Sequence, residues 1–164
     1  MPDKETLERV QSDKRQGKSP STQAGEFVRQ EIHHVRQGKH GARSTKQAIA
    51  IGLSEARRAG VKLPPPKRGA RSSTRKQARR DVAKGRRGGQ RTSPRRSSAV
   101  RKALKREGRS AASRPALSRQ ARAAARRRSA TSRRNAARKG AATKGPARRS
   151  AAARKAARSR KSRS

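Results

Sequence analysis

The chain has 164 residues, of which 50 are Lys or Arg and 9 are Asp or Glu, giving a formal net charge of +41. Only 27% of the residues are hydrophobic and none is Cys, which excludes a large packed core and a disulfide scaffold. The longest apolar run, residues 48–51, is too short to span a membrane. The first residues lack the layout of a secretory signal. We therefore expect a cytoplasmic polycation whose partner carries many negative charges.

The charge is unevenly spread along the chain. Residues 1–66 contain 13 basic and 7 acidic residues, whereas residues 67–164 contain 37 basic residues and only Asp81 and Glu107 as acidic ones. Three consecutive prolines, which are stiff and cannot continue a helix, separate the two parts. This pattern predicts a mostly α-helical head over residues 1–63, a polyproline hinge over 64–66, and a long disordered basic arm over 67–164.

Two helices are predicted first in the head. Residues 4–16 form the first, with Asp3 as a plausible cap and Gly17 as a stop. Residues 22–37 form the second, which Gly38 ends. The second helix carries one apolar stripe, which we expect to be its core face: Ala24, Phe27, Val28, Ile32 and Val35.

A third helix is predicted over residues 45–59, because Ser44 and Gln47 fit a capping box. A short glycine-containing loop joins it to the second, so the head should be a helical hairpin, or three helices if the first one also packs. Ile51 falls on the face opposite Ile49. It is either an exposed isoleucine or a contact with the first helix or with another chain, so a homodimer through the head is left open.

Three segments of the head carry a family resemblance: residues 21–28 (STQAGEFV), 38–53 (GKHGARSTKQAIAIGL) and 57–66 (RRAGVKLPPP). Together they resemble a family of small, basic bacterial proteins described as a domain of unknown function, sometimes with a loose DNA-binding label. Residues 99–108 (AVRKALKREG) resemble the longer members of that family. The resemblance implies a bacterial source, and it implies neither an activity nor a set of site residues.

The arm contains 28 Arg and 9 Lys, whose mutual repulsion should keep it largely disordered in water. Ala, Arg and Lys nevertheless favour helices, and a bound polyanion would remove the repulsion. We therefore expect three segments to become helical on binding: residues 73–84, ended by Gly85, residues 98–107, ended by Gly108, and residues 117–128.

Nucleic acid is the polyanion that the arm fits best. Duplex DNA carries one negative charge per roughly 1.7 Å, so the arm's net charge matches about 60 Å of duplex. The arm has no aromatic residue on which bases could stack, which predicts contact with phosphates and little base preference. Residues 92–96 (TSPRR) resemble the Ser-Pro-basic-basic element of histone tails, and the arm as a whole resembles linker-histone-like or protamine-like tails.

The predicted function is therefore histone-like, nucleoid-associated binding of duplex DNA by neutralisation of phosphate charge. Two alternatives remain open. One is an RNA-binding or ribosome-associated basic protein, and the other is a head that binds a protein partner while the arm localises it.

Candidate phosphate contacts follow from the positions of the basic residues. In the head, basic side chains gather beside the N-terminus of the third helix, where free N–H groups favour an anion, although an ordinary solvated loop would look the same. Together with two arginines near the end of the third helix, they make up the candidate phosphate contacts of the head: Lys39, His40, Arg43, Lys46, Arg57 and Arg58. The candidates in the arm are Arg79, Arg80, Arg86, Arg87, Arg95, Arg96, Arg126, Arg127, Arg128, Arg133, Arg134, Arg148 and Arg149.

No catalytic, metal or cofactor site is predicted. His33 and His34 are adjacent and diverge on a helix, His40 stands apart, and no spacing of His, Asp and Glu matches a metal site. The sequence shows no nucleophile paired with a base, so we expect the protein not to be an enzyme and to need no cofactor.

Overall fold

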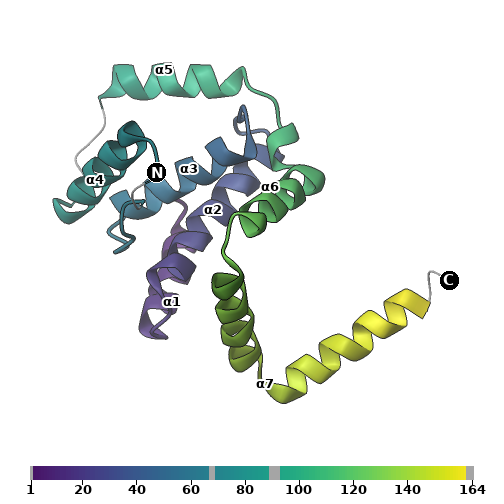
Figure 1. Cartoon of the computed structure of the whole chain (residues 1–164). Helices are drawn as coiled ribbons and strands as arrows, with labels where there is room; N and C mark the ends of the chain where they lie inside the picture. The colour runs from purple at the N-terminus through teal and green to yellow at the C-terminus, as the bar shows by residue number, and fades with distance from the viewer. Residues whose placement is uncertain (1, 67–68, 89–92, 162–164) are drawn as a thin grey trace. The chain divides into compact units, whose positions relative to one another are not determined.

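The computed structural model describes residues 2–66, 69–88 and 93–161, and all regular secondary structure in these ranges is helical (Figure 1). The chain forms two compact units, residues 1–120 and residues 121–164. Its elements are α1 (Lys4–Arg15), α2 (Pro20–Gln37), α3 (Thr45–Arg58), α4 (Ser72–Arg86), α5 (Pro94–Lys105), the 3-10 turn η1 (Ser110–Ala112), α6 (Arg114–Arg126) and α7 (Ala130–Lys161).

Helices α1, α2 and α3 lie where the apolar pattern and the capping residues predict them. Gly38 ends α2 in the left-handed conformation, with φ of 75°. At the start of α3, the Ser44 hydroxyl accepts the N–H of Gln47 at 3.2 Å, and the Gln47 side chain accepts the N–H of Arg43 at 2.8 Å. The capping box is therefore present in a modified form. The Gln47 side chain bonds to the backbone N–H of Arg43, where a standard capping box uses the N–H of the cap residue itself.

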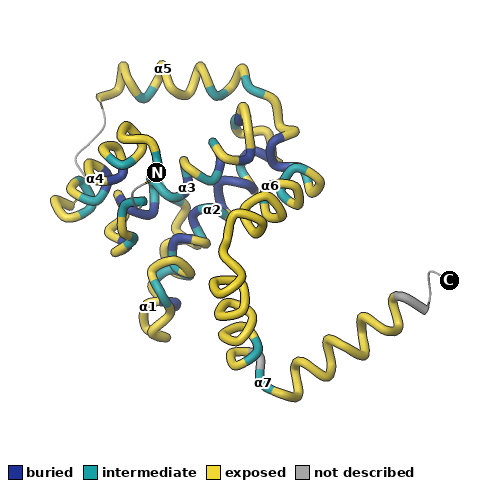
Figure 2. Tube along the Cα trace, viewed as in Figure 1, coloured by how far each residue is buried: buried dark blue, intermediate teal, exposed yellow. Residues whose placement is uncertain are grey.

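The core of the first unit lies along α2, against which α1 and α3 both pack. Phe27 is completely buried, as predicted, in a cluster with Ala24, Ala56 and Val61. Figure 2 shows that buried positions concentrate on α2, α3 and the turn at residues 110–112. Gly52 lets α2 and α3 approach closely, because a Cβ atom there would lie 2.7 Å from the Cα of Val28. Ile51 is half-buried, and a dimer contact through it stays a prediction.

The expectation of a long disordered arm over residues 67–164 is wrong, since helices occupy most of it. Helices α4, α5 and α6 overlap the three segments that were expected to fold only on binding, and α7 adds a fourth. Two physical reasons account for the difference. Ala, Arg and Lys have high helix propensity, and a like-charge pair one turn apart costs only a few tenths of a kcal/mol. Part of the arm also packs against the head.

The first docking point is α4, which packs on α3. Asp81 is almost completely buried there, and its Oδ1 lies 3.3 Å from Arg58 Nε and accepts a hydrogen bond from Gln77 Nε2 at 3.1 Å. Gly85, expected to stop the helix, lies inside α4 and against the end of α3. A Cβ atom at this position would lie 2.1 Å from the carbonyl oxygen of Arg57, so the small residue permits the contact.

The second docking point is the stretch from the end of α5 to η1. The backbone N–H groups of Gly41 and Ala42 donate to the carbonyls of residues 104 and 108 at 2.9 and 3.1 Å. The Thr45 hydroxyl donates to the carbonyl of Ala111 at 2.6 Å, and Ala112 is completely buried beside it. Small alanines thus extend the apolar cluster of α2 and α3 into the basic part of the chain.

The second unit has no comparable interior. Its helix α7 is interrupted at Gly145, where φ is 68° and ψ is 168°, and Pro146 follows. The missing N–H of the proline and the glycine conformation together divide α7 into two helical segments. Within residues 121–164, the described positions are exposed except Ala141 and Gly145, which are half-buried.

Candidate nucleic-acid interface

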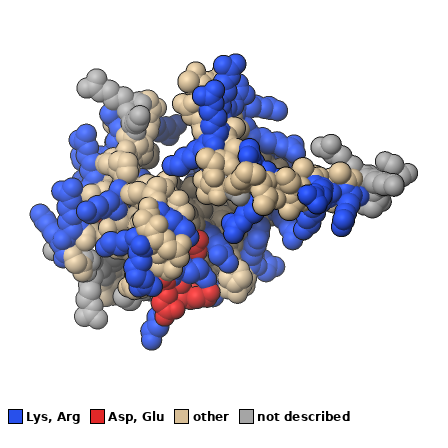
Figure 3. All heavy atoms as spheres, turned by 90° about the horizontal axis from the view of Figure 1, so that it is seen from below, with Lys and Arg blue, Asp and Glu red and all other residues tan. Residues whose placement is uncertain are grey.

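The positive charge of the second unit has no acidic counterpart in its own sequence. Residues 121–164 contain 17 Lys and Arg and no Asp or Glu, and the last acidic residue of the chain is Glu107. In the view of Figure 3, many Lys and Arg side chains and few Asp and Glu side chains are visible. An anion from outside the chain is the natural partner of such a surface.

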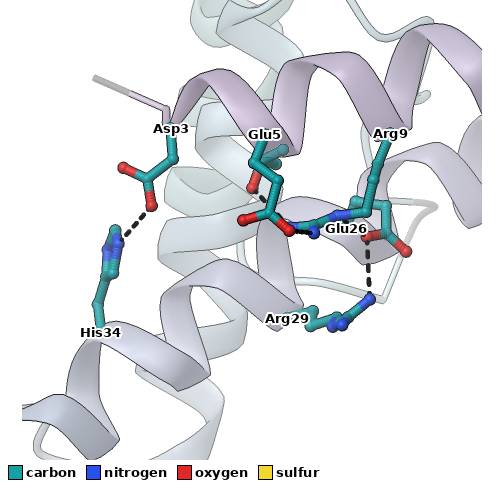
Figure 4. Close-up of polar contacts among 7 residues, drawn as sticks. Asp3, Glu5, Arg9, Glu26, Arg29 and His34 are labelled. Atoms are coloured by element: carbon teal, nitrogen blue, oxygen red, sulfur yellow. Dashed lines mark hydrogen bonds and ion pairs between the residues drawn. The ribbon is translucent and has the colours of Figure 1, made fainter.

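The acidic residues of the first unit are used within that unit. Seven of the chain's nine acidic side chains lie in ion pairs there, two of them with histidines. Between α1 and α2, Arg9 Nε lies 2.9 Å from Glu26 Oε2, and within α2 Arg29 lies 3.6 Å from the same oxygen (Figure 4). Lys18 pairs with Asp13 at 2.6 Å. Some of these pairs join two helices, as Arg9 and Glu26 do, and most of the Lys and Arg residues that the structure describes form no ion pair.

The arginines predicted as contacts in the arm are all exposed. They come from α4 and its end (Arg79, Arg80, Arg86, Arg87), from the first turn of α5 (Arg95, Arg96), from α6 and the following loop (Arg126, Arg127, Arg128), and from α7 (Arg133, Arg134, Arg148, Arg149). In the Ser-Pro-basic-basic element, Ser93 is the N-cap of α5 and Pro94 its first residue. Thr92 lies outside the described residues.

The candidates in the head separate into two groups. Lys39, Arg43 and Lys46 are exposed around the start of α3, and Arg43 Nε lies 3.7 Å from Glu107 Oε1. Their side chains are accessible to an anion, and the phosphate contact stays a prediction. Arg58 is exposed as well, but it faces the buried Asp81.

Arg57 and His40 are placed differently from what a surface contact requires. Arg57 is buried and donates to the carbonyls of Leu53 and Pro64 at 3.3 and 3.4 Å. Burial lowers the pKa of its guanidinium, and the carboxylate of Asp81 opposes that change. The sequence prediction treats Arg57 and Arg58 as equivalent, whereas Arg57 is buried and Arg58 is exposed beside Asp81.

His40 belongs to a polar cluster that the sequence prediction missed. One possible ligand atom from each of Glu31, His34 and His40 lies within 4.8 Å of the others. Burial raises the pKa of Glu31 to about 7, and the neighbouring His40 opposes this shift. The signal in the sequence was a Glu and a His three residues apart on α2, which share one face of a helix. His40 joins them because the chain reverses at Gly38.

Part of the chain matches a known protein family. A family described as "Family of unknown function (DUF6496)" matches residues 13–68, which include most of the head. That description carries no DNA-binding label, so the resemblance is supported as far as a family of unknown function. No curated protein and no solved structure matches the chain. Among the described residues, no helix combines the length and apolar character needed to cross a bilayer.

Proposed function

We propose that the protein binds nucleic acid, duplex DNA in preference to RNA, through the phosphate backbone and without reading base sequence. One observation carries the proposal. Residues 121–164 contain 17 basic residues and no acidic one, and their described positions are almost all exposed. In bacteria this activity would make the protein a histone-like component of the nucleoid.

The spacing of charge on α7 suits a phosphate backbone. A helix rises 1.5 Å per residue, so residues 146–161 extend about 24 Å. Duplex DNA presents about 14 phosphate charges over that length. The same residues contain seven Lys and Arg, about half as many charges as the duplex presents over that length. Arg adds paired hydrogen bonds to phosphate oxygens.

The composition argues for contacts that do not depend on base sequence. The chain has a single aromatic residue, Phe27, and it is completely buried. No Phe, Tyr or Trp ring is therefore left on which an unstacked base could lie. The described Arg and Lys residues of α7 are distributed around the helix and do not share one face. Contacts with phosphates carry no base information.

Equilibrium binding to a short fluorescent duplex, followed by anisotropy, tests the proposal. The test variant replaces four exposed arginines of α7 with Gln, which keeps helix propensity: Arg133, Arg134, Arg148 and Arg149. A matched control removes the same charge from exposed positions of the first unit: Lys4, Lys14, Arg15 and Lys62.

We expect the α7 variant to bind the duplex more weakly than the control variant, and two duplexes of different sequence to bind alike. Equal losses in both variants would show that only net charge matters and would contradict the proposed interface. A strong preference for one duplex would contradict the absence of base reading. Competition with a structured RNA ranks the two nucleic acids, and preferred binding of RNA would contradict the preference for DNA.

A further inference from the structure

The strongest group of chemically active side chains outside the basic surface lies where α2 ends. Glu31 and His34 come from α2, and His40 comes from the loop that follows it. Glu31 is only 2% exposed, and its Oε2 lies 3.5 Å from His40 Nε2. Its other carboxylate oxygen, Oε1, is buried and has no hydrogen-bond partner among the described residues. A buried carboxylate oxygen without a partner is costly, which points to a missing ligand.

Both imidazoles are oriented by a second contact. His34 Nε2 lies 3.0 Å from Asp3 Oδ2 (Figure 4), which leaves the Nδ1 lone pair of the neutral ring for a ligand. His40 Nδ1 lies 3.1 Å from the carbonyl oxygen of Gly41, which leaves Nε2, the nitrogen that faces Glu31. Histidines that bind metals in proteins are held in this way, with one ring nitrogen on a carboxylate or a carbonyl and the other on the ion.

The donor set selects the type of ion. Two imidazole nitrogens and one carboxylate oxygen suit Zn²⁺ and neighbouring transition metals, whereas Mg²⁺ and Ca²⁺ require oxygen ligands. Bonds of 2.0–2.1 Å in a tetrahedral zinc site place ligand atoms about 3.3 Å apart. The atoms here lie within 4.8 Å of one another, so small side-chain rotations would close the site.

The electrostatic surroundings make a chance cation unfavourable. The net charge of +41 repels cations from the surface in general. Near the cluster, the carboxylates of Asp3 and Glu55 add negative potential, and Lys39 opposes it. A cation that binds to this chain therefore needs specific ligands, and the cluster of Glu31, His34 and His40 supplies them.

We propose that Glu31, His34 and His40 bind one Zn²⁺ ion or a similar transition-metal ion, with Asp3 as a positioning residue for His34. The ion would join α2 to the loop that follows it and to the N-terminal segment before α1. This proposal stands independently of nucleic-acid binding.

The test uses the full chain, freed of nucleic acid and treated with a chelator, and titrates it with Zn²⁺ by calorimetry and with Co²⁺ by visible absorption. We expect one ion per chain and the intense absorption of tetrahedral Co²⁺. His40→Ala and Glu31→Gln should each weaken binding by more than about 100-fold, and Asp3→Asn by about 10- to 100-fold. Zn²⁺ should raise the melting temperature of the native chain but not that of His40→Ala.

His33→Ala is the matched control, because His33 is adjacent to His34 on the same helix, is exposed, and contacts Gln37 instead. It should bind Zn²⁺ like the native chain. Equal loss in His33→Ala and His40→Ala, or no stoichiometric uptake by the native chain, would overturn the proposal. Circular dichroism establishes that each variant is folded. If Glu31→Gln does not fold, the comparison of His40→Ala with His33→Ala decides.

Discussion

In residues 1–120 acidic side chains hold basic ones within the fold, whereas residues 121–164 contain no acidic side chain at all. The first unit buries Phe27 and carries a buried carboxylate at Asp81. The second unit consists of the end of α6 and the kinked helix α7. Nearly all of its described positions are exposed. The same basic residue types therefore lie in two different environments. In the first unit a few of them pair with acidic side chains, and in the second unit, under our proposal, they bind an external anion.

The largest expected effect concerns the core that only the first unit has. Phe27→Ala should lower the free energy of unfolding by about 3–5 kcal/mol, because a completely buried ring is replaced by a cavity. Chemical denaturation followed by circular dichroism measures the change. Val100→Ala removes an apolar side chain that is 54% exposed, and it should change stability by less than about 0.5 kcal/mol. Similar losses in both variants would show that α2 does not carry the core.

A second prediction compares the contributions to stability of Asp81 and Glu107, the two acidic side chains in residues 67–164. Asp81→Asn should cost about 1.5–3 kcal/mol, because it replaces a buried carboxylate that Arg58 and Gln77 both contact. Glu107→Gln should cost less than about 1 kcal/mol, because its partner Arg43 is largely exposed and lies 3.7 Å away. Urea denaturation of the two variants gives the comparison. An equal or larger cost for Glu107→Gln would contradict the docking of α4 through Asp81.

A smaller effect tests the close approach of α2 and α3. Gly52→Ala should destabilise the chain by about 1–3 kcal/mol, because the added Cβ would lie 2.7 Å from the backbone of Val28. Gly25→Ala is the control on α2, with no atom within 4 Å of the added Cβ. It should stabilise the helix by up to about 1 kcal/mol. The thermal melting temperatures should therefore move in opposite directions, and a shared direction would refute the close packing.

The sequence predicted the helices of the head because their signals are local. Apolar residues recur at helical spacing, Ser44 caps α3, and Gly38 ends α2. It did not predict the docking of the arm, because the residues that dock are inconspicuous. Ala112 and Gly85 fit through small size alone, and their role depends on partners far away in the sequence. The disorder prediction failed because it counted charge and large apolar residues only, and gave too little weight to the helix propensity of Ala, Arg and Lys.

The candidate sites show the same limit. Exposure of the arginines in α7 could be predicted, because no acidic or large apolar residue lies near them in the sequence. The different burial of Arg57 and Arg58 could not, because it depends on the elements that pack beside α3. The cluster of Glu31, His34 and His40 also forms only when the loop after α2 folds back.

The dependence of DNA binding on salt concentration tests the central contrast between the units most directly. Each lost phosphate contact should flatten the slope of log Kobs against log salt concentration by about 0.9. The α7 variant with four arginines replaced should therefore have a slope flatter by about 3–4 than the native chain. The matched variant of the first unit should change the slope by less than about 1. Equal changes in the two variants would contradict the account, because they would show that both units contact DNA alike.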